Sequence, residues 1–442
     1  MSAPARLEPI RVGMLGLGTV GSGTFRVLQR NQSEITRRAG RGIVVKSIAV
    51  RNLDKARALV GDGATLVVDP WLVVNDPDID IVAELIGGID PARALVMAAI
   101  TQGKHVVTAN KALLALHGNE IFRAARERGV MVAFEAAVAG GIPVIKALRE
   151  GLTANRIEWI AGIINGTTNF ILSEMRSKGL SFDVVLAEAQ RLGYAEADPA
   201  ADVEGIDAAH KLTLMSSLAF GIPVQFDRAH VEGIDKLTQA DIRYAEELGY
   251  RIKLLGITRR SADGIELRVH PTLVPKGQLI ANVEGAMNSV LIKGDAVGVT
   301  MYYGPGAGSE PTASAVIADL VDITRLATAD PENRVPHLAF QHDAIVDTPI
   351  LPVSAVVTGY YLRMRVADKP GVLADITRIM ADLSISIDAF LQKEPAPGES
   401  QAEIIILTHP TREAGIDAAL ARIEALESVI GSVVRIRQED LL

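Results

Sequence analysis

Ionisable side chains are concentrated between residues 189 and 211. Asp207 and Lys211 are four residues apart, so a helix would place them on one face. On an exposed helix such a pair adds only about 0.3–0.5 kcal/mol of stability. The residues after Lys211 are mostly apolar, however, which predicts a buried helix. A charged pair on a buried helix usually has a task, so the pattern favours a functional pair over a surface pair.

The same stretch supplies groups that suit an amino-acid alcohol as substrate. A carboxylate of Glu196, Asp202 or Asp207 can bind an ammonium group. A lysine can donate a proton to a carbonyl oxygen as a hydride arrives. The reverse reaction requires a neutral lysine, a state that burial or a second nearby cation promotes.

The pattern Gly16-x-Gly18-x-x-Gly21 suggests where the hydride carrier binds. It follows an expected strand at 10–15 and opens an expected helix that ends near 30. The first glycine permits a tight turn, the second lets a pyrophosphate approach, and the third allows close helix–strand packing. A purely structural turn is the alternative, but the strand–turn–helix context favours a dinucleotide. The expected contacts are Gly16, Leu17, Gly18, Thr19, Val20 and Gly21.

Two further strand ends bear on the cofactor. After the strand at 43–50, an acidic residue would bind the 2′-hydroxyl of NAD, but this chain has Arg51. A guanidinium suits a 2′-phosphate, so we expect NADP, with NAD possible because Asp54 follows closely. Lys111 follows the strand at 105–108, at the edge where parallel sheets bind ligands. The alternatives are a solvated charge at Arg51 and a surface lysine that starts a helix.

The order of elements predicts an α/β protein in three parts. Strands alternate with helices at first, which predicts a parallel sheet. The middle is α+β, and the last segment has the ferredoxin-like order β-α-β-β-α-β. The expected parts are a Rossmann-type domain at 1–140, completed by about 305–345, an α+β catalytic and dimerisation domain at 141–304, a linker at 346–357 and a C-terminal domain at 358–442.

Composition excludes several classes of protein. The chain has 45 Lys and Arg against 53 Asp and Glu, a formal net charge of −8, which argues against general nucleic-acid binding. It has no cysteine, hence no disulfide, thiolate zinc site or cysteine nucleophile. No apolar run reaches the roughly 20 residues of a membrane helix, and no signal-peptide core is present. We therefore expect a cytoplasmic protein with neither nucleic-acid nor membrane partners.

With these motifs in place, the sequence resembles the homoserine dehydrogenase family. The run Ala189-x-x-x-Gly193-Tyr194-Ala195-x-x-Asp198-Pro199-x-x-Asp202-Val203-x-Gly205-x-Asp207-x-x-x-Lys211 fits the family signature position by position. The segments 108–111, 165–169 and 304–308 are also similar to family motifs, and the likeness covers about 10–345. It implies reversible NAD(P)-dependent reduction of L-aspartate 4-semialdehyde to L-homoserine.

The resemblance also implies roles for single residues. Lys211 would donate the proton to the aldehyde oxygen, and Lys111 would be a second lysine near cofactor and substrate. Glu196, Asp202 and Asp207 would hold the substrate, with Glu196 and Asp207 nearest its amino group. Gly306 and Glu310 would lie near the cofactor.

The family has a monovalent-cation site that matches residues 135–142. A carboxylate with successive main-chain carbonyls suits sodium, because hard cations prefer oxygen ligands. The implied ligands are Glu135, Val138, Gly140 and Ile142. A glycine-rich hinge between domains is the alternative, and one segment can serve both purposes.

The C-terminal segment resembles an ACT domain in the turn Asp368-Lys369-Pro370-Gly371-Val372-Leu373-Ala374. Such domains bind amino acids between paired copies, which implies a homodimer or homotetramer with L-threonine as a feedback effector. Its candidate contacts are Asp368, Lys369, Gly371, Val372 and Leu373. A module that only oligomerises is the alternative, since real coupling requires threonine to favour one quaternary state.

Two rival functions remain open at this point. A 2-hydroxyacid dehydrogenase with a sensing tail would need a catalytic histidine with carboxylate and arginine partners. The eight histidines offer no comparable constellation. The second rival is a nicotinamide-binding sensor without catalysis. Activity with aspartate semialdehyde separates both from the implied enzyme.

Overall fold

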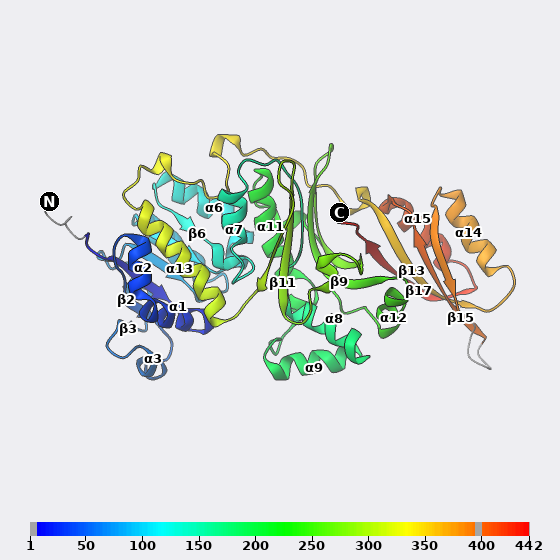
Figure 1. Ribbon diagram of the computed structural model, residues 1–442, viewed down its shortest axis with the longest axis horizontal. Coiled ribbons are helices and arrows are strands. Elements are labelled where there is room, and N and C mark those ends of the chain that lie inside the picture. Colours follow the sequence, from blue (N-terminus) through cyan, green and yellow to red (C-terminus); the bar gives the residue numbers. More distant parts are fainter. Residues whose placement is uncertain (1–6, 394–399, 442) are drawn as a thin grey trace.

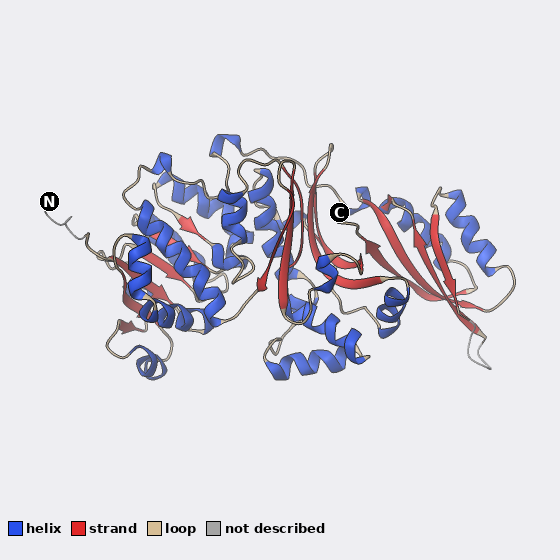
Figure 2. Cartoon of the chain, viewed as in Figure 1, coloured by secondary structure: helices blue, strands red, loops and turns tan. Residues whose placement is uncertain are grey.

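The computed structural model describes residues 7–393 and 400–441. Its strands form a six-stranded sheet near the N-terminus and an eleven-stranded sheet from the middle of the molecule to the C-terminal end (Figures 1 and 2). The mixed α/β architecture with a parallel dinucleotide-type sheet confirms the predicted fold class. Within the described ranges, no helix is both long and apolar enough to cross a membrane.

The N-terminal sheet has the order β3-β2-β1-β4-β5-β6, and its neighbouring strands are parallel. β4 is buried along its whole length, as expected of a strand covered by helices on both faces. The elements are β1 Ile10–Leu15, α1 Thr19–Arg30, α2 Gln32–Ala39, β2 Ile43–Ala49, α3 Leu53–Val60, β3 Thr65–Val67, α4 Pro70–Val74, β4 Ile81–Glu84, α5 Ala92–Thr101, β5 His105–Thr108, α6 Lys111–Glu127 and β6 Val132–Ala133.

A late helix returns to complete this first layer. α13 (Ser309–Leu326) packs against α1, and the two helices lie side by side in Figure 1. The crossing is tight at Gly23, where a Cβ would lie 2.5 Å from the Ser309 carbonyl oxygen. A glycine is therefore required there for the two helices to approach so closely.

The middle of the chain places helices against the larger sheet. α11 (Ile206–Phe220) packs on β7, β9 and β10, and nearly all of its residues are buried. The elements are α7 Val144–Lys146, β7 Ile157–Ile163, α8 Gly166–Lys178, α9 Phe182–Leu192, α10 Ala200–Val203, β8 His230–Val231, α12 Gln239–Glu247, β9 Tyr250–Arg260, β10 Ile265–Pro275, β11 Met287–Gly294 and β12 Gly298–Pro305.

The C-terminal domain has the predicted β-α-β-β-α-β order, with sheet order β17-β13-β15-β14. Its elements are β13 Val357–Ala367, α14 Val372–Asp382, β14 Ile387–Gln392, β15 Gln401–Thr408, β16 Thr411–Arg412, α15 Glu413–Glu424 and β17 Val429–Gln438. Residues 346–357, expected to be a linker, include a β-bridge from Ile350 to Ile265 and a 3-10 turn at Val353–Ala355.

This domain continues the sheet of the middle domain. β17 pairs in parallel with β10, at Thr272 with Arg437 and at Leu273 with Gln438. Nothing in the local sequence pattern predicts this junction, because it joins strands more than 160 residues apart. The two domains therefore share one continuous sheet.

Candidate active site

The centre of the site is a carboxylate between two lysines. Asp207 and Lys211 lie one helical turn apart on α11, and Lys211 Nζ is 2.7 Å from Asp207 Oδ2. Lys111 Nζ, at the start of α6, is 3.2 Å from Asp207 Oδ1. Lys211 Nζ also donates a hydrogen bond to the Ile164 carbonyl oxygen at 2.8 Å. The centre thus lies where the Rossmann-type sheet meets the middle domain.

Asn165 connects this centre to a second carboxylate. Its Nδ2 donates to Asp202 Oδ1 at 2.7 Å and to Asp207 Oδ2 at 2.8 Å. Its Oδ1 accepts from Thr168 N at 2.8 Å, so the same side chain caps the start of α8. The sequence marked Asn165 only as part of a family motif. The capping pattern before an expected helix was the available signal for its fixed position.

Burial and neighbouring charges act differently on the two acids. Burial alone would raise the pKa of Asp207, but the charges of Lys211 and Lys111 hold that pKa well below its ordinary value. Burial raises the pKa of Asp202, and the hydrogen bond from Asn165 only partly opposes it. Asp207 is therefore a permanent anion, while Asp202 gains from a cation brought by a ligand.

Other side chains surround the centre without joining it. Glu196 is exposed on the loop after α9, and among the described residues only its main-chain carbonyl oxygen accepts a side-chain hydrogen bond, from Gln190. His210, which the sequence did not single out, lies beside Phe226, with ring centroids 4.4 Å apart. Burial lowers the pKa of His210, so its ring is neutral near the two lysines.

The glycine turn between β1 and α1 has the form that a pyrophosphate requires. Gly16 has φ 99°, and a Cβ on Gly21 would lie 2.3 Å from the Gly16 carbonyl oxygen. Gly18 is exposed at the start of α1, and a Cβ placed there would meet nothing within 4 Å. Open space above a helix N-terminus fits a dinucleotide. Leu17, Thr19 and Val20 border the same opening and are partly or fully exposed.

A buried glutamate organises the neighbouring strand ends. Glu84, at the end of β4, accepts hydrogen bonds from Ile86 N and Gly87 N, both at 3.0 Å. Its other oxygen accepts from Thr108 Oγ1 at 2.6 Å, which fixes the end of β5 beside Lys111. Sequence reasoning missed Glu84, although an acidic residue closing a buried apolar strand was a usable signal.

Two residues expected to contact the cofactor, Arg51 and Glu310, are exposed on the surface. Arg51 is exposed two residues beyond the end of β2, where a strand-end charge was expected. Glu310 is exposed in the first turn of α13 and forms two hydrogen bonds with Arg30, each 2.9 Å long. Its carboxylate is thus engaged in holding α13 against α1.

The segment 135–142, proposed from sequence to hold a cation, begins with a glutamate whose side chain is hydrogen-bonded. Glu135 Oε1 accepts from Ile145 N at 2.9 Å and Oε2 from Lys146 N at 2.8 Å. Both oxygens therefore accept main-chain hydrogen bonds at the start of α7, while the Glu135 carbonyl oxygen takes no part in these bonds. Gly140, with φ 44°, lies against Gly306, whose carbonyl oxygen would be 2.5 Å from a Cβ there. Val138 and Ile142 are buried beside it.

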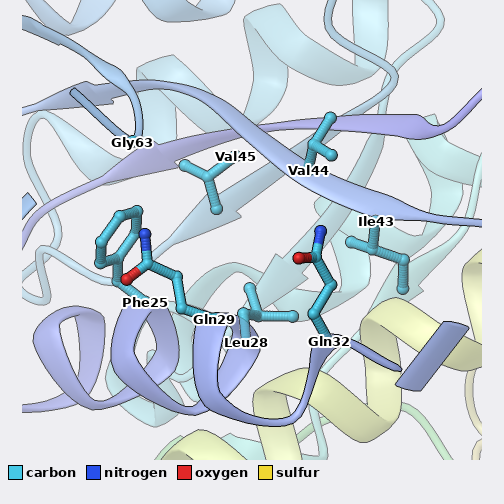
Figure 3. Close-up of a pocket in the computed structure, with 8 residues that line it drawn as sticks. All are labelled: Phe25, Leu28, Gln29, Gln32, Ile43, Val44, Val45 and Gly63. Atoms are coloured by element: carbon cyan, nitrogen blue, oxygen red, sulfur yellow. The ribbon is translucent and has the colours of Figure 1, made fainter. Parts of the chain in front are cut away.

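A pocket of about 210 Å³ lies away from this centre, between α1 and β2 (Figure 3). It is lined by Phe25, Leu28, Gln29, Gln32, Ile43, Val44, Val45 and Gly63. The pocket holds no ionisable side chain and lies at the amino end of β2. Ligands of parallel sheets bind at the carboxyl ends.

A dinucleotide fold that faces a buried lysine–carboxylate centre defines the class of nicotinamide-dependent oxidoreductases. Family models agree: "Homoserine dehydrogenase, NAD binding domain" matches residues 16–135, "Homoserine dehydrogenase" matches 143–321, and "ACT domain" matches 360–428. A homoserine dehydrogenase of Pseudomonas aeruginosa is 62% identical over 98% of this chain and 100% of its own length. The chain belongs to the homoserine dehydrogenase family.

Solved structures support the same assignment. A homoserine dehydrogenase from Thiobacillus denitrificans superposes with a TM-score of 0.95, at 71% identity over 99% of both chains. One from Staphylococcus aureus has a TM-score of 0.76, at 32% identity over 99% of this chain and 100% of its own. A hyperthermophilic archaeal homoserine dehydrogenase in complex with NADPH has a TM-score of 0.63, at 26% identity over 73% of this chain and 99% of its own.

Proposed function

We propose that the protein reversibly reduces L-aspartate 4-semialdehyde to L-homoserine with NADP as the preferred cofactor. The observation that carries this proposal is Asp207 held between Lys211 and Lys111 at the junction of the two domains. The bound nicotinamide supplies or accepts the hydride. The chain itself must bind the amino acid, orient its oxygen and move one proton.

Lys211 is proposed as the proton donor. An ammonium group has three N–H donors. Two are directed to Asp207 Oδ2 and the Ile164 carbonyl oxygen, which leaves one for the substrate oxygen. Lys111 is the proposed second catalytic lysine, and its partly exposed side chain can reach substrate and cofactor alike. Asp207 orients both ammonium groups, because its oxygens are already engaged by them.

Asp202 is proposed as the main partner of the substrate ammonium. Asp207 is already neutralised by two lysines, whereas Asp202 accepts from the neutral amide of Asn165. A ligand cation would relieve the cost of burying the Asp202 charge. Glu196 is proposed to add a second carboxylate from its exposed loop once substrate is bound.

The remaining proposals concern cofactor and regulation. Arg51 would bind the 2′-phosphate, Gly16–Gly21 and Lys111 would contact the dinucleotide, and Gly306 would lie close to it. Glu310 would act indirectly, by fixing α13.

A sodium ion would be held by main-chain carbonyls of Glu135, Val138, Gly140 and Ile142. L-threonine would bind at residues 368–373, which comprise the exposed turn 368–371, where Gly371 has φ 97°, and the first two residues of α14.

The test is oxidation of L-homoserine by the purified protein, followed at the nicotinamide absorbance with NADP and NAD in parallel, with and without L-threonine. We expect turnover with preference for NADP, and inhibition by threonine. A simple 2-hydroxy acid serves as the control substrate and should not react. A folded protein that oxidises no homoserine with either cofactor would contradict the proposed reaction, whereas turnover insensitive to threonine would contradict only the effector.

A further inference from the structure

A partly buried ion pair joins the C-terminal domain to a short segment of the middle domain, residues 230–234, here called the bridging segment. Arg437 of β17 donates from Nη1 to Glu232 Oε2 at 2.8 Å and from Nη2 to Glu232 Oε1 at 2.9 Å. Arg437 is 1% exposed, and its Nε also donates to Glu413 Oε2 at 2.7 Å. A two-pronged charged contact of this kind fixes direction as well as distance. The bridging segment is thus held from the C-terminal side.

Charge complementarity supports the strength of this contact. Burial alone would raise the pKa of Glu232, but hydrogen bonds from His230 and Arg437 hold that pKa far below its ordinary value. Arg435 adds a further positive charge, with Nη2 at 3.5 Å from Glu232 Oε1. Glu232 is therefore an anion that forms ion pairs with two arginines of β17, Arg435 and Arg437.

The other side of the bridging segment lies against α10. Ile234 N donates to the Val203 carbonyl oxygen at 2.8 Å. A Cβ on Gly233 would lie 2.3 Å from the same oxygen, and a Cβ on Gly205 would lie 3.2 Å from Val231 Cγ1. The bridging segment is thus in close contact with residues 203–205, at the end of α10.

α10 is short and depends on its neighbours for its position, which include α8 and α11 as well as the bridging segment. It has four residues, Ala200–Val203, far fewer than the dozen or so that an isolated helix needs. Asp202 lies in this helix, with Asn165 on one side and the bridging segment next to the helix end. The segment in turn has a two-residue strand, β8, paired to β10 at two positions. Glu232 N also donates to the Val269 carbonyl oxygen of β10 at 2.8 Å. The Glu232 side chain on Arg437 attaches the segment to the C-terminal domain.

We infer that Glu232, fixed by Arg437, is a positioning residue for Asp202, so that docking of the C-terminal domain sets how firmly the substrate ammonium is held. The inference rests on the proposed function, because that function gives Asp202 its role. It assigns Glu232 and Arg437 no contact with substrate, cofactor or reacting atoms. The pairing of β17 with β10 would then help to position Asp202 as well as stabilise the fold.

The test uses the full-length variant Glu232→Gln, which keeps the shape of the side chain but removes its charge. Tyr244→Phe is the matched control, because Tyr244 Oη donates to Glu403 Oε2 at 2.7 Å and so crosses the same two domains elsewhere. We expect the KM for homoserine to rise roughly three- to tenfold in Glu232→Gln, with kcat and the KM for NADP within about twofold of wild type. Tyr244→Phe should leave all three unchanged.

Amide hydrogen exchange over residues 200–206 provides a readout that needs no substrate. We expect faster exchange there in Glu232→Gln than in wild type and Tyr244→Phe. Arg437→Lys alters the same ion pair from the C-terminal domain and should raise the homoserine KM as well. This variant replaces Glu232→Gln if Glu232→Gln does not fold.

The outcomes separate this inference from the proposed reaction. Unchanged exchange at 200–206 in a folded variant would overturn the positioning role, whatever the kinetics show. An equal effect of Tyr244→Phe would also overturn it, since any domain contact would then suffice. A wild-type protein that oxidises no homoserine would sink the proposed function, while the exchange measurement would still decide whether Glu232 fixes α10.

Discussion

Lys111 and Lys211 belong to different domains, yet their ammonium groups bind opposite oxygens of one carboxylate, with distances to Asp207 of 3.2 Å and 2.7 Å. Asp207 therefore links Lys111 of the first domain to Lys211 of the middle domain, in addition to placing a negative charge in the site. Relative movement of the domains would separate Lys111 from Lys211. The proposed chemistry thus depends on how the two domains are placed relative to one another as much as on any single side chain.

The first prediction concerns the proton donor. Lys211→Ala should lower kcat by about 10²–10⁴-fold, because proton transfer by a positioned group contributes about that much. Circular dichroism and NADP binding should remain as in wild type. Lys178→Ala is the control, because that lysine pairs with surface acids Glu174 and Glu188. Turnover near the wild-type rate in Lys211→Ala would refute the assignment.

The second prediction concerns Asn165. Asn165→Asp removes both hydrogen bonds to Asp202 and Asp207 and adds a third carboxyl group. We expect the KM for homoserine to rise at least about tenfold, since each lost charged hydrogen bond is worth about 1.5–3 kcal/mol. Steady-state kinetics with each substrate varied in turn checks this. An equal rise in the KM for NADP would point to general damage instead.

The third prediction concerns cofactor choice. Arg51→Ala should raise the KM for NADP by about 10- to 100-fold and leave the KM for NAD nearly unchanged, because only NADP has the 2′-phosphate. The nearby surface variant Lys55→Ala should change neither constant. If Arg51→Ala weakened both cofactors equally, the side chain would be serving the fold or the shared part of the dinucleotide.

The fourth prediction concerns pH and stability. Burial and the nearby Glu135 raise the pKa of Asp319 to about 8, and burial raises that of Glu135 to about 7. An acid with a raised pKa binds more protons when folded, so the free energy of unfolding should fall as pH rises from about 4 to about 8. Asp319→Asn stays neutral and should flatten this fall.

Urea unfolding at several pH values between 5 and 9 measures the effect. Wild type should lose stability towards pH 8, at up to about 1.4 kcal/mol per pH unit for one group. Parallel curves for wild type and Asp319→Asn would show that Asp319 is already ionised in the fold.

The features predicted from sequence were mostly local. The four-residue spacing of Asp207 and Lys211 and the strand–turn–helix around Gly18 depend on neighbours along the chain, and both were read directly. The position of Lys111 after a strand indicated the ligand-binding edge of the sheet, but its contact with Asp207 was not predicted, because it joins residues 96 positions apart. Periodicity carries no signal for such a contact.

The parts that were missed have the same physical origin. Several strands of the larger sheet were not predicted, among them β9, β11 and β12, although β9 is buried along most of its length. The two main-chain N–H groups at the start of α7 that bind the Glu135 carboxylate were not predicted either. Which partner a buried acid finds depends on the whole fold, and residue type alone does not decide it.

The continuous sheet makes the C-terminal segment part of the catalytic fold and not an appendage. A truncation before Val357 would expose the edge of β10 at Thr272 and Leu273, and open strand edges recruit other chains. It would also strip Arg268, which is 1% exposed, of Glu439. Loss of the tail would therefore favour aggregation over an active shortened protein, so a test of the proposed threonine effect needs point substitutions in the full-length chain.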